Sequence, residues 1–78
     1  METLLLDSYG YLNVVAYNIG QLTLKIFDTN GHFAKKLCKD IIAGVQKLDV
    51  LGDLTKGTYI INAFKGEKFL NAFKFVKQ

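Results

Sequence analysis

Several residue types on which common functions depend are missing from this sequence. Its 78 residues include no proline, no tryptophan and no arginine, so all ten basic residues are lysines. Proteins that read nucleic acids rely on arginine for two-point contacts with guanine and phosphate. A domain without arginine, whose net charge is only +3, is therefore a poor candidate for nucleic-acid binding.

Cysteine, histidine and serine each occur once. A single cysteine excludes an internal disulfide, and we expect Cys38 to be half-buried in a strand. A Ser–His–Asp triad would require Ser8 to meet His32, which stands in an expected turn, and nothing suggests an oxyanion hole. A metal site needs three or four converging ligands. We therefore predict that the protein is not an enzyme and has no catalytic residue, metal or cofactor.

Long hydrophobic runs are also absent. No apolar segment reaches the roughly 20 residues of a membrane helix, so we predict no transmembrane segment. The opening residues, Met1–Ser8, lack the basic start and the apolar stretch of a signal peptide. If the domain is exported, the information must lie upstream or within the domain itself.

Half of the residues are hydrophobic, and glycine or asparagine separates them into short runs. Runs spaced by about ten residues are typical of an all-β sandwich or barrel, and no segment has a convincing helical period. Because the apolar faces must cover each other, we expect one domain, residues 1–78, built as a two-sheet, immunoglobulin-like Greek-key sandwich. The seven predicted antiparallel strands are residues 3–7, 11–17, 22–28, 33–38, 45–51, 58–64 and 68–76.

A hairpin is predicted between the third and fourth strands. Asn30 and Gly31 both tolerate positive φ, and Asn-Gly between two strand-like runs is the strongest short hairpin signal. Asp28 and Asn30 could also suggest calcium binding, but the turn preferences of these residues explain them more simply.

A second local motif precedes the sixth strand. Tyrosine at the start of a strand in a Greek-key sandwich often bonds the backbone just upstream, as a tyrosine corner. We expect the Tyr59 ring to be buried, with its hydroxyl on the backbone of residues 53–56. Gly57 is expected to adopt positive φ, and Leu54 to close one end of the core.

The last strand is apolar on both faces. We expect one face to join the core and the other to be partly covered or to form a docking patch beside Lys74 and Lys77. A free edge could accept a partner strand or form a homodimer, through this C-terminal strand or another edge. Alternation places Phe69, Phe73 and Phe75 on one face and Leu70, Ala72 and Val76 on the other.

Read together, these motifs resemble the type IX secretion system C-terminal sorting domain, type A. The resemblance covers about residues 12–78, and residues 1–11 are an extra strand or a linker remnant. It implies a scaffold built on seven positions. The matching motifs are the segment Leu22–Asp28 with Gly31, Gly44 ahead of Leu48-Asp-Val50, the segment Leu54–Ile61 with Gly57 and Tyr59, Gly66, and Lys74–Lys77; the scaffold positions are Asp28, Gly31, Gly44, Leu54, Gly57, Tyr59 and Gly66.

The resemblance also implies a function. Such a domain is a non-catalytic signal that an outer-membrane translocon recognises, and it carries an N-terminally fused passenger through the periplasm to the cell surface or the medium. The residues expected to be recognised are Lys74, Phe75, Val76, Lys77 and Gln78. We expect removal of Lys74 and Lys77 to impair recognition without loss of stability.

The alternative is a stand-alone extracellular binding or adhesive module, because the sequence opens with Met1. Three tyrosines near the start of the chain could then form a stacking platform for a carbohydrate, although core filling is the favoured role for aromatic residues in a small domain. These residues are Tyr9, Tyr11 and Tyr17.

Overall fold

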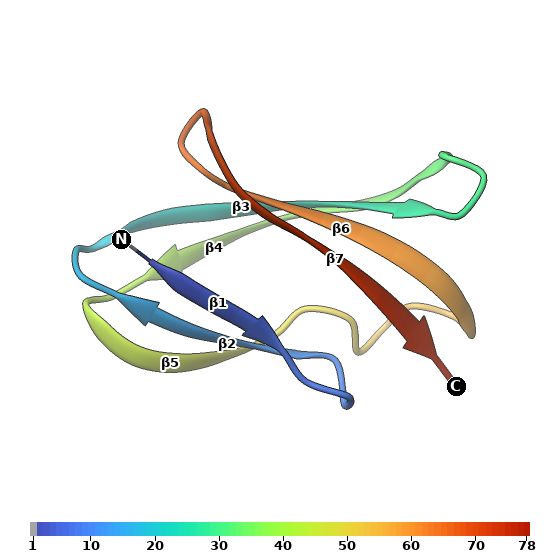
Figure 1. Ribbon diagram of the computed structural model, residues 1–78, viewed down its shortest axis with the longest axis horizontal. Helices are drawn as coiled ribbons and strands as arrows, with labels where there is room; N and C mark the ends of the chain where they lie inside the picture. The colour runs from blue at the N-terminus through green and yellow to red at the C-terminus, as the bar shows by residue number, and fades with distance from the viewer. Residues whose placement is uncertain (1) are drawn as a thin grey trace.

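The computed structural model describes residues 2–78, and in this range the chain forms seven β-strands and no helix (Figure 1). The predicted all-β class and the number of strands are confirmed. Nothing in the described chain forms a helix that could cross a bilayer. The strands are β1 (Thr3–Leu6), β2 (Tyr11–Ala16), β3 (Gly20–Asp28), β4 (Phe33–Ile41), β5 (Gly44–Asp49), β6 (Gly57–Lys65) and β7 (Lys68–Lys77).

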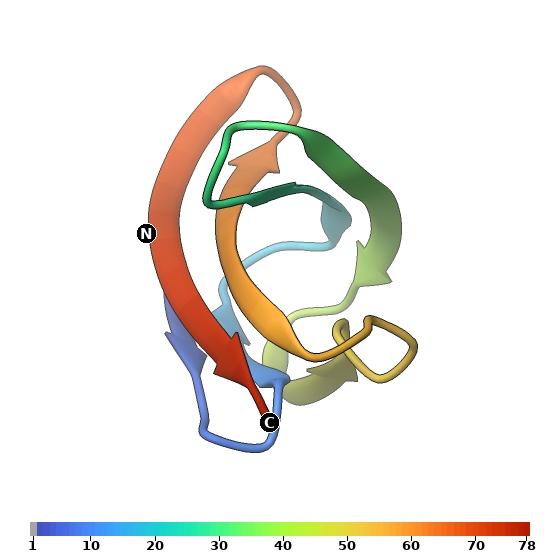
Figure 2. The same ribbon diagram turned by 90° about the vertical axis from the view of Figure 1, so that its right-hand side faces the viewer.

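The strands are arranged in two antiparallel sheets. One sheet has the order β1-β2-β5 and the other the order β4-β3-β6-β7. The connections β2–β3, β4–β5 and β5–β6 therefore pass from one sheet to the other. Figure 2 shows the two sheets curving around a common interior when the molecule is viewed from one end.

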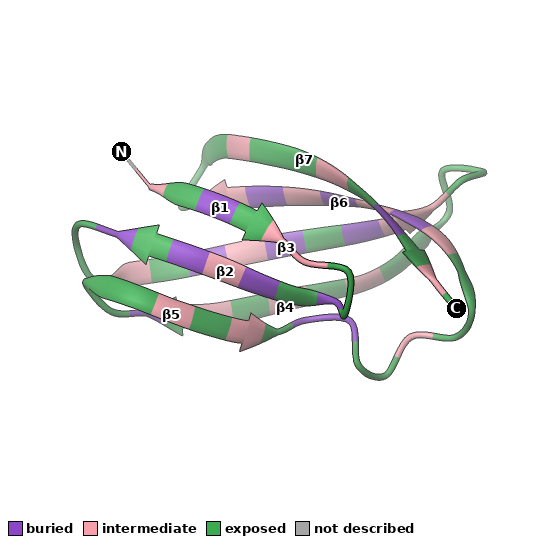
Figure 3. Ribbon diagram, turned by 60° about the horizontal axis from the view of Figure 1, so that its bottom comes forward, coloured by how far each residue is buried: buried purple, intermediate pink, exposed green. Residues whose placement is uncertain are grey.

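The interior is filled by one side of each central strand. In β3, Leu22, Leu24 and Ile26 are fully buried, whereas Lys25 is exposed (Figure 3). This alternation is the one predicted from the sequence, because successive side chains of a strand point to opposite faces. Each fully buried aliphatic side chain stabilises the fold by about 1.5–3 kcal/mol.

The predicted hairpin between β3 and β4 is confirmed. One carboxylate oxygen of Asp28 accepts the backbone N–H groups of Asn30 and His32, each at 2.9 Å. Gly31 has φ = 83°, the conformation that glycine adopts without strain. The exposed His32 ring lies 3.5 Å from the other Asp28 oxygen, within the same turn.

The predicted bonding of Tyr59 is also confirmed. Its side chain is only 7% exposed, and its hydroxyl donates to the backbone oxygen of Thr55 at 2.8 Å. The Thr55 hydroxyl lies 3.1 Å from the same oxygen of Tyr59. Gly57 has positive φ, and Leu54 packs against the core.

The expected division of the β7 faces was right for Phe73 and Phe75 against Ala72 and Val76, but wrong for Phe69 and Leu70. The register between β6 and β7 shifts at Phe64: Phe69 pairs with Phe64 and Asn71 with Ala63, so Leu70 is an extra residue in β7. Leu70 therefore packs against the core, while Phe69 is 53% exposed and meets the Phe64 ring edge to face at 5.5 Å. Such a bulge reverses the alternation on one side of the inserted residue.

The expectation that Cys38 is half-buried was wrong as well. Cys38 is exposed, with its sulfur 3.8 Å from the Thr23 hydroxyl. It lies on β4, which is an edge strand of the four-stranded sheet. The neighbours Leu37 and Lys39 take the inward side of β4, so alternation turns the thiol outward.

Candidate functional site

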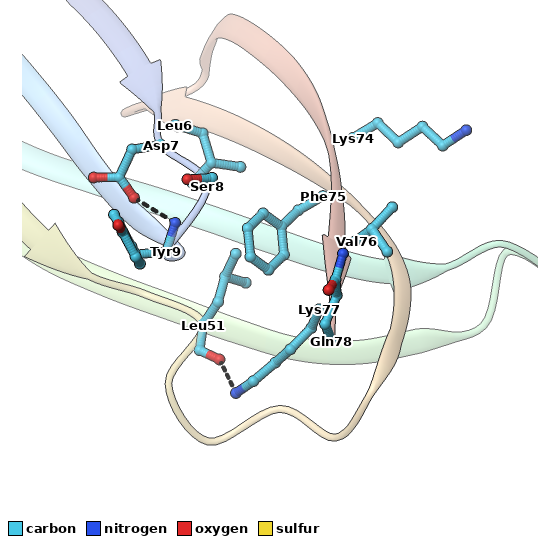
Figure 4. Close-up of a pocket in the computed structure, with 10 residues that line it drawn as sticks. All are labelled: Leu6, Asp7, Ser8, Tyr9, Leu51, Lys74, Phe75, Val76, Lys77 and Gln78. Carbon is cyan, nitrogen blue, oxygen red and sulfur yellow. Dashed lines mark hydrogen bonds between the residues drawn. The ribbon is translucent and has the colours of Figure 1, made fainter.

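A cleft of about 680 Å³ lies beside the end of β7 (Figure 4). One wall is the turn between β1 and β2, and the other is the C-terminal segment. The five residues expected to be recognised by a translocon all line this cleft, which makes it the candidate site. The lining residues are Leu6, Asp7, Ser8, Tyr9, Leu51, Lys74, Phe75, Val76, Lys77 and Gln78.

The floor of the cleft is apolar. Phe75 is 8% exposed, and its ring points toward the side chain of Leu51, which is fully buried (Figure 4). Gly10, in the β1–β2 turn, has φ = 90°. A Cβ atom at Gly10 would lie 3.2 Å from Leu51 Cβ and 3.5 Å from the Phe75 ring. Only glycine therefore fits this turn against the floor.

Asp7 holds the wall formed by the β1–β2 turn. One carboxylate oxygen accepts the N–H groups of Tyr9 at 2.9 Å and Tyr11 at 3.0 Å, and the other lies 3.3 Å from the amide nitrogen of Asn13. Loss of hydration raises the pKa of Asp7, but these hydrogen bonds and the nearby charge of Lys47 outweigh it. The pKa of Asp7 is therefore held below its ordinary value.

The sequence analysis missed Asp7 and Gly10. A signal was present, because Asp7-Ser-Tyr-Gly10 has the same spacing as the hairpin motif Asp28-Thr-Asn-Gly31. In both turns the aspartate accepts backbone N–H groups two and four residues later. The shared spacing thus specifies the same turn twice.

Lys77 has a structural contact that the sequence analysis did not anticipate. Its ammonium group donates to the backbone oxygens of Leu51 at 2.8 Å and Gly52 at 2.9 Å. These bonds tie the end of β7 to the connection between β5 and β6. Lys77 therefore helps to hold the cleft together.

The remaining terminal residues are open to solvent. Lys74, Val76 and Gln78 are exposed, and Figure 4 shows the Lys74 side chain extending away from the cleft. Within residues 2–78, no hydrogen bond or ion pair involves the ammonium group of Lys74. Alternation along β7 thus separates inward residues, Phe75 and Lys77, from outward ones.

We expect Lys77→Ala to lower the free energy of unfolding by about 1 kcal/mol, because two hydrogen bonds to backbone carbonyls are lost. Lys74→Ala should change it by less than about 0.5 kcal/mol, because its side chain is exposed. Urea denaturation of both variants measures the difference. Equal stability of the two variants would show that the Lys77 contacts contribute nothing, as the sequence analysis had expected.

Stability should fall in acid. The pKa values of three carboxyl groups are lowered: Glu2 by Lys65, Asp53 by Lys35, and Asp7 as described above. The unfolded chain therefore binds more protons, and this stabilisation is present above the ordinary values of 4.5 for Glu and 3.8 for Asp and is lost as pH falls below them. Thermal melts between pH 6 and pH 3 should show a falling Tm.

A double variant, Asp7→Asn with Asp53→Asn, serves as the control for the acid effect. It removes two of the three carboxyl groups whose pKa values are lowered in the folded protein, so its Tm should depend less on pH than that of the parent. A parent Tm that stays constant down to pH 3 would contradict the linkage.

No three side chains of histidine, cysteine, aspartate or glutamate in residues 2–78 come together as a metal-binding group.

The tyrosines of the proposed carbohydrate platform are exposed, so the expectation that they fill the core was wrong. Tyr9 is 85%, Tyr11 37% and Tyr17 63% exposed. Tyr11 begins β2 and carries the ammonium group of Lys47 at 4.8 Å from its ring centre. Tyr17 follows the other end of β2, about 20 Å away at strand rise. The three rings therefore do not form one platform.

No protein-family model and no curated protein matches the chain.

Proposed function

We propose that the chain is a non-catalytic sorting domain, similar to type A domains of type IX secretion, which an outer-membrane translocon recognises to export a fused passenger. The observation that carries the proposal is that residues 74–78 alternate between side chains held against the protein and side chains exposed to solvent. Phe75 and Lys77 anchor the segment to the core and to the β5–β6 connection. Lys74, Val76 and Gln78 are left exposed beside an open cleft.

The edge of β7 supports a mode of recognition. Among residues 2–78, β7 is the last strand of its sheet, so no other strand of this range pairs with the outer edge of its backbone. A partner can add a strand to such an edge and read alternate side chains. In this mode the partner contacts Lys74 and Val76, while the inward residues set the position of the edge.

We also propose that the sheets form an immunoglobulin-like Greek key. The order β1-β2-β5 facing β4-β3-β6-β7, with three connections that pass between the sheets, supports this assignment. The bond from Tyr59 to Thr55, just ahead of β6, supports it too, because tyrosine corners occur at such crossings.

A fusion experiment tests the proposed function. Residues 1–78 are attached to the C-terminus of a periplasmic reporter in a bacterium with a type IX translocon, and reporter at the cell surface and in the medium is measured. We expect export of the parent fusion and its loss in Lys74→Glu with Val76→Asp. Lys36→Glu, at an exposed lysine on β4, is the matched control. A parent reporter that stays in the periplasm would refute the proposal.

A second candidate is a stand-alone extracellular binding module. The specific observation is Tyr9, which lines the cleft and is 85% exposed, so its ring could stack on a sugar or a protein ligand. A glycan-binding screen with the parent and Tyr9→Ala tests it. Binding that disappears in Tyr9→Ala supports the module, and a screen without any ligand counts against it.

Homodimer formation through the free edge of β7 or of another edge strand stays a prediction. The edge strands are β1, β5, β4 and β7, and β7 carries Lys68, Lys74 and Lys77, which oppose pairing with an identical strand. Sedimentation at increasing protein concentration measures it. A constant monomer mass would remove the homodimer and leave the edge for another partner.

A further inference from the structure

Four large apolar side chains are exposed at one end of the molecule. Tyr17 is 63%, Ile19 77%, Ile42 63% and Val45 82% exposed. We call these four residues the apolar tip. Single exposed apolar residues are common, but a contiguous group of them marks an interaction site.

The apolar tip comes from two neighbouring connections and from Val45 at the start of β5. Ala16 pairs with Gly44 and Gly20 pairs with Ile41, so the β2–β3 and β4–β5 connections lie side by side at the left end in Figure 1.

The connections themselves, residues 17–19 and 42–43, carry no charge. Exposed Asn18 lies between Tyr17 and Ile19, and exposed Asp40 stands near the end of β4, where it pairs with Gln21. The tip is therefore uncharged, with polar side chains at its border.

Part of the backbone of the tip forms hydrogen bonds with a side chain of the same protein. The side-chain amide of Gln46 accepts the N–H of Ile42 at 3.0 Å and donates to the oxygen of Ile42 at 2.6 Å. An unpaired backbone group is costly to move out of water, whereas a paired one is much less so. Gln46 thus presents the Ile42 side chain outward while it lowers the cost of placing this connection in an apolar medium.

We propose that the apolar tip inserts into the interface of a lipid bilayer. The size of the tip distinguishes a lipid surface from a protein partner. The tip offers four exposed apolar side chains at the narrow end of a molecule whose extents are 34 × 24 × 17 Å. A standard protein interface takes about 20–30 residues from each partner. A bilayer has no such requirement, because it closes around a small convex tip.

The chemistry of the tip also suits lipid. Isoleucine and valine favour the acyl region, and tyrosine concentrates at membrane interfaces because its ring is apolar and its hydroxyl polar. The nearby ammonium group of Lys65 forms an ion pair with the Glu2 carboxylate at 2.6 Å. Binding should therefore occur on neutral phosphatidylcholine and gain little from anionic lipid. This proposal does not depend on the sorting function.

The absence of tryptophan gives a direct test. Ile42→Trp places one fluorophore at the tip, and Val76→Trp places one at the opposite end, on a side chain that is 52% exposed. On addition of phosphatidylcholine vesicles, we expect the emission of Ile42→Trp to shift to shorter wavelength and that of Val76→Trp to stay unchanged. No shift for Ile42→Trp, or equal shifts for both, would overturn the proposal.

Vesicle flotation of the unlabelled protein gives the second measurement. We expect Ile19→Ser with Ile42→Ser to lower the partition coefficient by about tenfold or more, because two inserted side chains become polar. Val76→Ser should leave it unchanged. Binding that requires anionic lipid would overturn the proposal and indicate electrostatic attraction by lysine side chains instead. If the emission of Ile42→Trp shifts with protein concentration in the absence of vesicles, the tip binds a second copy of the chain and the proposal is overturned.

Discussion

Phe75→Ala is expected to lower the free energy of unfolding by about 3–5 kcal/mol, the cost of truncating a buried phenylalanine to alanine. The Phe75 side chain is 8% exposed and belongs to the core cluster. Its ring also supports Gly10, at which a Cβ atom would lie 3.5 Å from the ring. The cavity left by the ring is therefore bordered by the β1–β2 turn, which has little room to rearrange.

This loss is large for a chain of 78 residues, because natural domains are stable by only about 5–15 kcal/mol and small ones lie near the lower limit. Urea denaturation with circular dichroism measures it. Val76→Ala is the matched control and should cost less than about 1 kcal/mol, since its side chain is half exposed. A Phe75→Ala protein as stable as the parent would contradict the packing described for the cleft floor.

The prediction also affects how recognition is tested. A Phe75 variant that loses export would do so through unfolding, so it carries no information about contact with a translocon. Lys74, Val76 and Gln78 are the positions at which substitution separates recognition from stability, because they are exposed.

Tyr59→Phe is expected to lower the free energy of unfolding by about 1–3 kcal/mol, because a part-buried carbonyl loses its hydrogen bond. The hydroxyl of Tyr59 donates to the Thr55 oxygen at 2.8 Å, and the substitution removes this donor while it keeps the ring. The Thr55 hydroxyl, 3.1 Å away, loses its partner as well. The connection ahead of β6 should therefore loosen before the sheets separate.

Two further variants make the measurement specific. Tyr17→Phe removes a hydroxyl from a ring that is 63% exposed and should leave stability within about 0.5 kcal/mol of the parent. Thr55→Ala removes the hydroxyl of Thr55 but keeps its backbone oxygen, so its cost should be smaller than that of Tyr59→Phe. If Tyr59→Phe and Tyr17→Phe are equally stable, the tyrosine hydroxyl does not stabilise this connection.

Local patterns in the sequence determined the strands, the hairpin and the bond of Tyr59. Alternating Leu22, Leu24 and Ile26 predict a half-buried strand because the period of a strand is two residues. Asn30-Gly31 predicts a tight turn because both residues tolerate positive φ. These signals act over a few neighbouring residues, so they can be read without knowledge of the rest of the chain.

Other features depend on which segments meet in space. The extra residue Leu70 is defined only by its pairing with β6, so alternation alone placed Phe69 on the wrong face. The exposure of Cys38 follows from which face of β4 meets the core: Leu37 packs against it, so Cys38 points outward. The exposure of Tyr9 and Tyr17 follows from their places before and after β2.

In the candidate site, too, some features follow from the local sequence and others only from contacts between distant segments. The sequence by itself marked residues 74–78 and the motif that places Tyr59 against the backbone, because both are contiguous in the chain. Only the tertiary structure brought Lys77 to the carbonyls of Leu51 and Gly52, 25 or more residues away, and set the β1–β2 turn against Phe75. Sequence patterns report the preferences of neighbours, whereas contacts between distant segments arise when two sheets bury their apolar faces together.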